Sequence, residues 1–115
     1  PGYQGPKGET GRYRWANVDP GHEVELEIDL PECCVASDIF VRILPDRVLV
    51  RLLGDEVIDD TLLNRVDPDE SSWEIRGSRL VVLLQKAGGS KVPWPSVFLE
   101  DTKRTIDLDE LTRFF

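Results

Sequence analysis

Few side chains in this sequence could do acid–base or metal chemistry, and most of those are carboxylates. Asp59 and Asp60 are adjacent, and a second group follows at Asp67, Asp69 and Glu70. Paired carboxylates can exchange protons with a substrate or hold a calcium ion. This spacing lacks the glycine and the terminal glutamate of a calcium-binding loop. We therefore interpret both groups as solvated turn residues.

Nucleophiles and soft metal ligands are also sparse. His22 is the single histidine, and Cys33 and Cys34 are neighbours. A catalytic triad needs a histidine beside a nucleophile, and structural zinc needs about four ligands. The sequence contains no glycine-rich phosphate loop and no nucleophile elbow. We therefore expect no enzymatic activity, no metal and no cofactor. A disulfide between adjacent cysteines would close almost no loop, so two free thiols indicate a reducing compartment, cytoplasmic or nuclear.

The remaining candidates are residues that bind other proteins. Large aromatic side chains and arginines carry binding energy where they form a partly desolvated cluster. Phe40, Arg42 and Arg51 belong to a row with more apolar members than a solvated sheet face needs. We predict that this row binds a partner and that Lys86 and Trp94 extend it. Two alternatives stay open: another part of the chain covers the row, and Trp94 fills an edge of the fold.

The strands that position this row are visible as two-residue alternation. Between residues 22 and 30, apolar residues alternate with an acidic outer row from Glu23 to Asp29, which is typical of a half-buried strand. Residues 39–44 and 47–53 are joined by the turn dipeptide Pro45-Asp46 and are apolar on both faces, so we expect both to lie centrally in a sheet. One face of this pair carries Phe40, Arg42, Leu44, Leu49, Arg51 and Leu53.

Further strands are predicted at 56–58, 61–66, 71–76 and 80–84, with Gly77 in the last turn. Short strands separated by turns every eight to twelve residues or so predict an all-β fold, an antiparallel β-sandwich of about seven strands. Residues 106–113 are consistent with one or two helical turns. We expect the interior to contain Val24, Leu26, Ile28, Val41, Val50, Trp73, Ile75, Val82 and Leu84.

The length and net charge of the chain limit the number of domains and the classes of partner. The chain has 115 residues and a net charge of −8, which suits one domain and disfavours nucleic acids and anionic membranes as partners. It starts at Pro1 and contains no methionine, so we expect a domain of a longer protein. Glycine recurs every third residue in 1–12, which we interpret as a flexible linker. The domain is expected at 13–96, with a C-terminal extension at 97–115 that packs on the domain or trails it.

The order of several motifs resembles the CS domain, the β-sandwich of the NudC proteins and of several heat-shock co-chaperones. Tyr13-Arg14-Trp15, Glu70-Ser71-Ser72-Trp73, Leu84 with Lys86, and Thr102-Lys103-Arg104 lie where NudC sequences carry similar residues. Trp94-Pro95 resembles the start of the tryptophan-proline motif of a small acidic co-chaperone, whose remainder is absent here.

The resemblance implies a non-enzymatic chaperone or co-chaperone, monomeric as an isolated domain. It would bind unfolded clients or a heat-shock chaperone. The alternative is an adaptor that docks one fixed partner, such as a dynein-pathway protein, without holdase activity.

Overall fold

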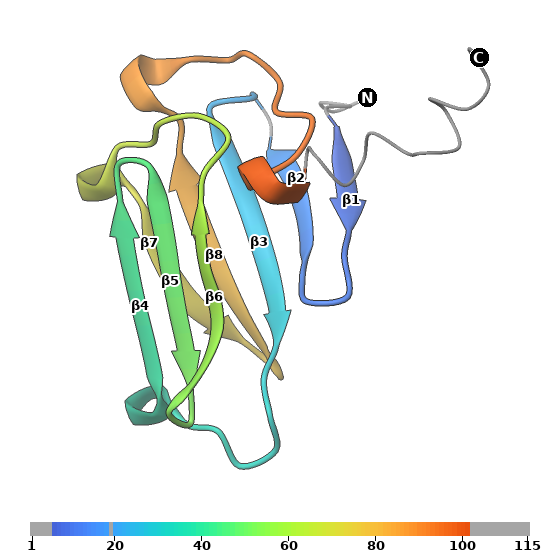
Figure 1. The fold of residues 1–115 in the computed structure, drawn as a ribbon, viewed down its shortest axis with the longest axis vertical. Coiled ribbons are helices and arrows are strands. Elements are labelled where there is room, and N and C mark those ends of the chain that lie inside the picture. Colours follow the sequence, from blue (N-terminus) through green and yellow to red (C-terminus); the bar gives the residue numbers. More distant parts are fainter. Residues whose placement is uncertain (1–5, 19, 102–115) are drawn as a thin grey trace, which may run out of the picture.

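A computed structural model describes residues 6–18 and 20–101 of the chain. These residues form two antiparallel sheets packed face to face (Figure 1), which confirms the predicted all-β sandwich. The five-stranded sheet has the order β1-β2-β3-β8-β7 and the three-stranded sheet the order β4-β5-β6. The strands are β1 (Lys7–Glu9), β2 (Arg14–Val18), β3 (Glu23–Asp29), β4 (Ile39–Leu44), β5 (Arg47–Leu52), β6 (Asp55–Thr61), β7 (Ser72–Arg76) and β8 (Arg79–Gln85). Three short 3₁₀ helices are η1 (Ala36–Asp38), η2 (Pro68–Glu70) and η3 (Ala87–Gly89). No helix of this described part is long and apolar enough to cross a membrane.

Strand β3 has the predicted alternation. Val24, Leu26 and Ile28 are buried, while the acidic residues between them face outward. Pairing with β2 on one side and β8 on the other places these apolar residues in the middle of the five-stranded sheet. The hydrophobic pattern thus fixes which face of β3 joins the core.

The three-stranded sheet confirms the predicted shared face of β4 and β5 and corrects the predicted position of β4. In the register of this pair, Phe40 lies opposite Arg51 and Arg42 lies opposite Leu49. All four residues therefore share one face, as the alternation predicted. β5 is central, but β4 forms the edge of the sheet, so the prediction that both lie centrally is wrong for β4.

The core confirms most of the expected interior and corrects one member. Val24, Leu26, Ile28, Val50, Val82 and Leu84 are buried. Val41 and Trp73 are partly buried against the core, whereas Ile75 is 39% exposed, so its predicted burial is wrong. Val41 lies on β4, and Trp73 and Ile75 lie on β7. Both are edge strands with no neighbour on one side, which leaves their inward side chains only partly covered.

Residues on both sides of the expected domain, 13–96, take part in the sandwich, and for Val97 and Phe98 this agrees with an extension that packs on the domain. Residues 7–9, placed in the flexible linker, form β1 and pair with β2. Gly8 lies opposite Trp15, and a Cβ atom there would lie 2.7 Å from the Trp15 Nε1 atom, so the indole packs against bare backbone. Val97 and Phe98, placed in the C-terminal extension, are fully buried in the core. The predicted helical turns at 106–113 lie outside the described residues.

A buried polar contact joins the two ends. The Tyr13 hydroxyl donates a hydrogen bond to the Asp101 carboxylate, and the Tyr13 ring meets the Phe98 ring edge-on at 5.5 Å. The Arg12 guanidinium lies 2.9 Å from the Asp60 Oδ2 atom and 5.8 Å from the centre of the Tyr13 ring. Burial, and then the hydrogen bond to Asp101, raises the pKa of the Tyr13 phenol.

This raised pKa predicts a loss of stability at alkaline pH. Above about pH 10, the ordinary tyrosine pKa, the unfolded chain can release the phenol proton while folded Tyr13 retains it. The contribution of Tyr13 is therefore fully present below that pH and declines as the pH rises further. We expect the free energy of unfolding to fall more steeply between about pH 9 and pH 11 in the parent than in Tyr13→Phe. Urea unfolding at several pH values measures both slopes, and equal slopes would contradict the assignment.

Candidate protein-binding surface

The face that carries Phe40, Arg42, Leu44, Leu49 and Arg51 lies on the outside of the three-stranded sheet. Together with Leu53, which lies in the turn after β5, it is here called the arginine face. Phe40 is 46% exposed and Leu53 48% exposed, and both Arg42 and Arg51 are exposed. Neither the second sheet nor the described N-terminal residues cover it, which excludes the covered alternative for this part of the chain. The Arg51 guanidinium carbon lies 5.5 Å from the centre of the Phe40 ring, within cation–π range.

The two arginines of the arginine face form no close ion pair, although Glu56 of β6 lies opposite Arg51 in the sheet. Arg42 and Arg51 form no ion pair with any carboxylate in residues 6–18 and 20–101. Arg47, at the end of the same face, pairs with Asp59 at 2.6 Å, and this hydrogen bond raises the pKa of its guanidinium. The face therefore presents two guanidinium groups that are not held in a close ion pair, beside exposed apolar side chains, within a protein of net charge −8.

On the outer face of the five-stranded sheet, most acidic side chains are neutralised by ion pairs with arginines of the same chain. Glu25 pairs with Arg76 at 2.9 Å, and Glu27 pairs with Arg79 at 3.2 Å. Asp29 pairs with a third arginine, Arg14, at 3.0 Å. Val81 lies on this outer side of β8, opposite Glu27 and Glu74, yet it is fully buried. The ion pairs therefore leave no apolar surface free at Val81, and most acidic groups of the β3 row already have partners.

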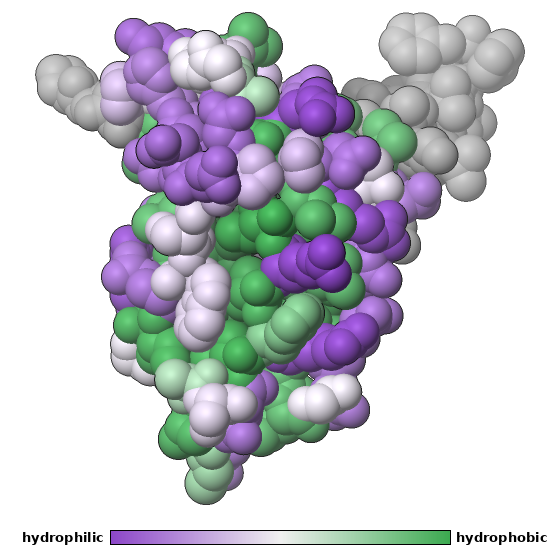
Figure 2. Space-filling model, turned by 90° about the vertical axis from the view of Figure 1, so that its left-hand side faces the viewer, coloured by the Kyte–Doolittle hydropathy of each residue, from purple (hydrophilic) through white to green (hydrophobic). Residues whose placement is uncertain are grey.

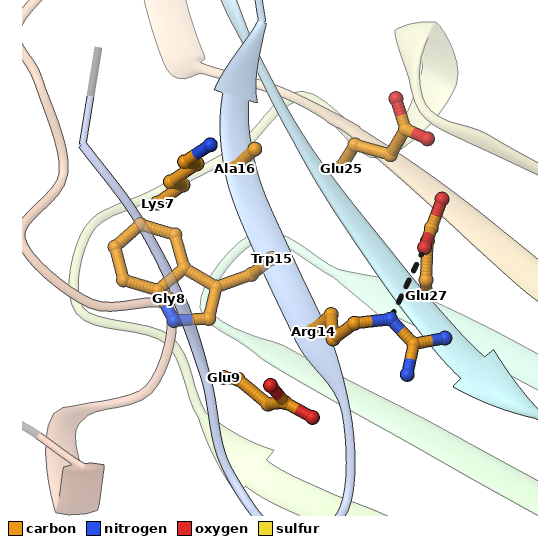
Figure 3. A pocket seen from close by; sticks show the side chains of 8 residues that line it. All are labelled: Lys7, Gly8, Glu9, Arg14, Trp15, Ala16, Glu25 and Glu27. Carbon is orange, nitrogen blue, oxygen red and sulfur yellow. Dashed lines mark hydrogen bonds and ion pairs between the residues drawn. The ribbon is translucent and has the colours of Figure 1, made fainter.

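A shallow groove of about 560 Å³ lies over β1, β2 and β3 (Figure 3). It is lined by Lys7, Gly8, Glu9, Arg14, Trp15, Ala16, Glu25 and Glu27. Acidic and basic side chains are mixed along it, and Arg14 donates to the Glu27 carboxylate at 3.4 Å (Figure 3). The groove has no dominant charge, so we assign no ligand to it. No group of three or more potential metal ligands occurs in the part of the chain that the structure describes.

Lys86 and Trp94 do not extend the arginine face, so their prediction as partner-binding residues is wrong. Lys86 is 1% exposed and Trp94 is 2% exposed. Lys86 follows β8 of the other sheet, and its ammonium group donates to Asn17 Oδ1 and to the Val92 carbonyl, each at 2.8 Å. Burial lowers the pKa of Lys86. The structure thus supports the alternative in which Trp94 fills the fold.

Asn17 organises this buried cluster and was missed from sequence. Its Oδ1 atom accepts from Lys86 and from the Trp94 backbone N–H at 3.0 Å. Its Nδ2 atom donates to the Trp94 carbonyl at 3.0 Å and to the Pro6 carbonyl at 2.7 Å. The available signal was a polar residue two positions after the inward-facing Trp15, where a core residue is expected.

The comparisons agree with this architecture. Residues 11–86 match the family model of the CS domain. The chain belongs to the CS domain family. Its CS domain is 26% identical over 91 residues to mouse NudC domain-containing protein 1, a match that covers 77% of this chain and 15% of that protein. Among solved structures it resembles the nuclear movement protein from E. cuniculi GB-M1, with a TM-score of 0.63 and 25% identity, over 77% of this chain and all of that one.

A second solved structure supports the fold alone. The CS domain of the human KIAA1068 protein is 16% identical, with a TM-score of 0.69, over 82% of this chain and 77% of that one. Together the matches support a relation to the NudC branch of CS domains. Domains of this type are non-catalytic, related to co-chaperones, and bind other proteins.

Proposed function

We propose that this CS domain is a chaperone or co-chaperone module that binds unfolded clients or a heat-shock chaperone through the arginine face. The observation that carries the proposal is the pair of exposed arginines, Arg42 and Arg51, beside the exposed ring of Phe40. The similarity to CS domains and NudC proteins supports the class of function, and the exposure of this face supports its location. The free thiols of Cys33 and Cys34 are compatible with a cytoplasmic or nuclear location.

The chemistry of the face suits a protein partner. An arginine can pack its stem on apolar surface while its planar head pairs with a carboxylate through two hydrogen bonds. Because Arg42 and Arg51 have no internal partner, binding a carboxylate breaks no existing ion pair. Exposed Phe40 and Leu53 add apolar area that becomes buried when a partner covers them.

The double substitution Arg42→Glu/Arg51→Glu tests the proposal. We expect the fold to persist, because exposed charged side chains contribute only about 0–1 kcal/mol to stability. Capture of client or chaperone should weaken by about tenfold or more, since reversed charges repel what the arginines attracted. Pull-down from lysate and suppression of client aggregation measure this loss, and circular dichroism confirms the fold.

A matched control changes the net charge equally at another site. Arg65 and Lys91 are exposed, lie outside the arginine face and form no ion pair among the described residues. Arg65→Glu/Lys91→Glu should therefore bind like the parent. Equal loss in both double variants would point to a general charge effect and contradict the proposed surface.

An adaptor without holdase activity is the second candidate. The observation that favours it is the similarity to a nuclear movement protein and to a NudC domain-containing protein, whose names describe a pathway instead of client protection. Light scattering of a heat-labile client, without nucleotide, separates the two. Suppression of aggregation supports the chaperone, whereas capture of one fixed partner without suppression supports the adaptor.

A further inference from the structure

The two sheets have four edges, and three of them carry features that oppose pairing with another chain. β1 is only three residues long and carries exposed Lys7 and Glu9. β6, Asp55–Thr61, carries four acidic residues, and just past its end Leu62 forms a bridge with Phe98. β7 alternates charged residues along its outer face, where Glu74 and Arg76 are ion-paired. Short length, charge and cover are the usual protections of a sheet edge.

β4 lacks these protections. It is six residues long, Ile39–Leu44, and contains one charged residue, Arg42, and no proline. It pairs with β5 on one side and with no strand of the described chain on the other. The backbone N–H and C=O groups on that side are therefore available to another strand.

Apolar surface continues around this edge. β4 and β7 form the same side of the sandwich (Figure 1), and Figure 2, which faces that side, shows a hydrophobic band running down its middle between hydrophilic flanks. Inward side chains of both edge strands remain partly exposed here because the sandwich is open between them. They are Ile39, Val41, Ile43, Trp73 and Ile75.

We propose that β4 binds an extended segment of a partner protein as an added strand, and that this segment alternates apolar and acidic residues. The inference rests on the proposed function, since it uses the same face, and it specifies how the partner is held. Successive side chains of a strand point to opposite sides. One set would cover the apolar band, and the other would lie on the arginine face beside Arg42.

The positive charge of Arg42 is the reason why we expect acidic residues in the added strand. Cross-strand neighbours on one face of a sheet interact directly, and opposite charges there are favourable. Arg42 has Leu49 as its neighbour on β5 and none on the open side. An acidic residue of the added strand would occupy that empty position, and Arg51 lies one strand further in on the same face.

Charge also argues against a second copy of this chain as the occupant. Each copy carries a net charge of −8, so two copies repel. A two-fold pairing of β4 centred on Arg42 would place two arginines directly opposite each other, which is destabilising. The chain does contain an alternating segment of its own, Ile106-Asp107-Leu108-Asp109, and the experiment below treats it as a competing occupant.

The test uses the full chain and a synthetic peptide of alternating valine and glutamate, with a valine–lysine peptide as control. We expect the valine–glutamate peptide to bind, and to slow hydrogen exchange at every second amide of β4, since alternate amides of an edge strand face its open side. Two peptides should bind about tenfold more weakly or worse than the valine–glutamate peptide, which is roughly 1.4 kcal/mol. They are the valine–lysine peptide and a valine–glutamate peptide with all backbone amides N-methylated. Arg42→Glu should weaken the valine–glutamate peptide similarly.

Several results would overturn the inference. They are no binding, equal binding of the two charge patterns, equal binding after N-methylation, or protection that appears on β7 instead of β4. If N-methylation has no effect but Arg42→Glu/Arg51→Glu still abolishes client capture, strand addition fails while the proposed function stands. If that double variant captures clients normally, the proposed function itself fails. A third result concerns hydrogen exchange in the absence of peptide. If the β4 amides already exchange slowly in the parent and lose this protection in Asp107→Lys/Asp109→Lys, the occupant is the chain's own segment, and the partner assignment is overturned.

Discussion

Replacement of Asn17 by leucine should lower the free energy of unfolding by at least about 2 kcal/mol, because each buried polar group left without a partner costs roughly 1–3 kcal/mol. Two such groups lose their partner with Asn17, the Trp94 backbone N–H and the Trp94 carbonyl. The Lys86 ammonium loses one hydrogen bond and keeps the other, to the Val92 carbonyl. The Pro6 carbonyl keeps a second donor, the Asn17 backbone N–H at 2.9 Å. Urea unfolding monitored by tryptophan fluorescence measures the loss.

The control for this prediction is Asn17→Asp. An aspartate keeps an acceptor for Lys86 and for the Trp94 N–H, and it adds a charge opposite to that of Lys86. It removes the two hydrogen bonds that the Nδ2 atom donates and places an oxygen against the Pro6 and Trp94 carbonyls, a cost that the new ion pair with Lys86 partly offsets. Asn17→Asp should therefore lose clearly less stability than Asn17→Leu. If Asn17→Leu and the parent were equally stable, the role assigned to the buried network would be contradicted.

Trp94→Ala should be comparably damaging, with an expected loss of about 3–5 kcal/mol for truncation of a fully buried tryptophan. Trp94 is the largest fully buried side chain of the described structure. Phe40→Ala should change stability by no more than about 0.5 kcal/mol, as is usual for exposed positions. Trp73→Ala, at a partly covered edge position, should fall between them. The reverse ranking of Trp94 and Phe40 in thermal or urea unfolding would contradict the division into core and surface.

The sequence predicted the local features of this fold well because they depend on local periodicity. Alternation alone located β3, β4 and β5 and placed Phe40, Arg42 and Arg51 on one face. It could not show which strand lies at an edge, since that depends on the order of strands in the sheet. β4 and Ile75 were placed too deeply for this reason. The Lys-Gly-Glu sequence of β1 has no apolar alternation, so only its pairing with β2 reveals it as a strand.

The candidate site was predicted in part for the same reason. Exposure of Arg42 and Arg51 follows from their own strand pattern. Burial of Lys86 depends on Asn17, which is 69 residues away in sequence, and on Val92 in the following loop. A lysine is seldom fully buried without such partners. A pattern within one strand contains no information about partners so distant in the chain, and this explains why Lys86 and Trp94 were assigned to the surface.

Chemical-shift mapping with an unfolded protein tests the central claim most directly, that the arginine face binds partners. The ¹⁵N-labelled chain would be titrated with reduced and carboxymethylated α-lactalbumin, which stays unfolded and carries acidic groups. We predict that the perturbed amides cluster on β4, β5 and the turn at Leu53, and that Arg42→Glu/Arg51→Glu removes these perturbations. Perturbations confined to β2, β3 and β8 on the ion-paired opposite face, or unchanged in the double variant, would contradict the account.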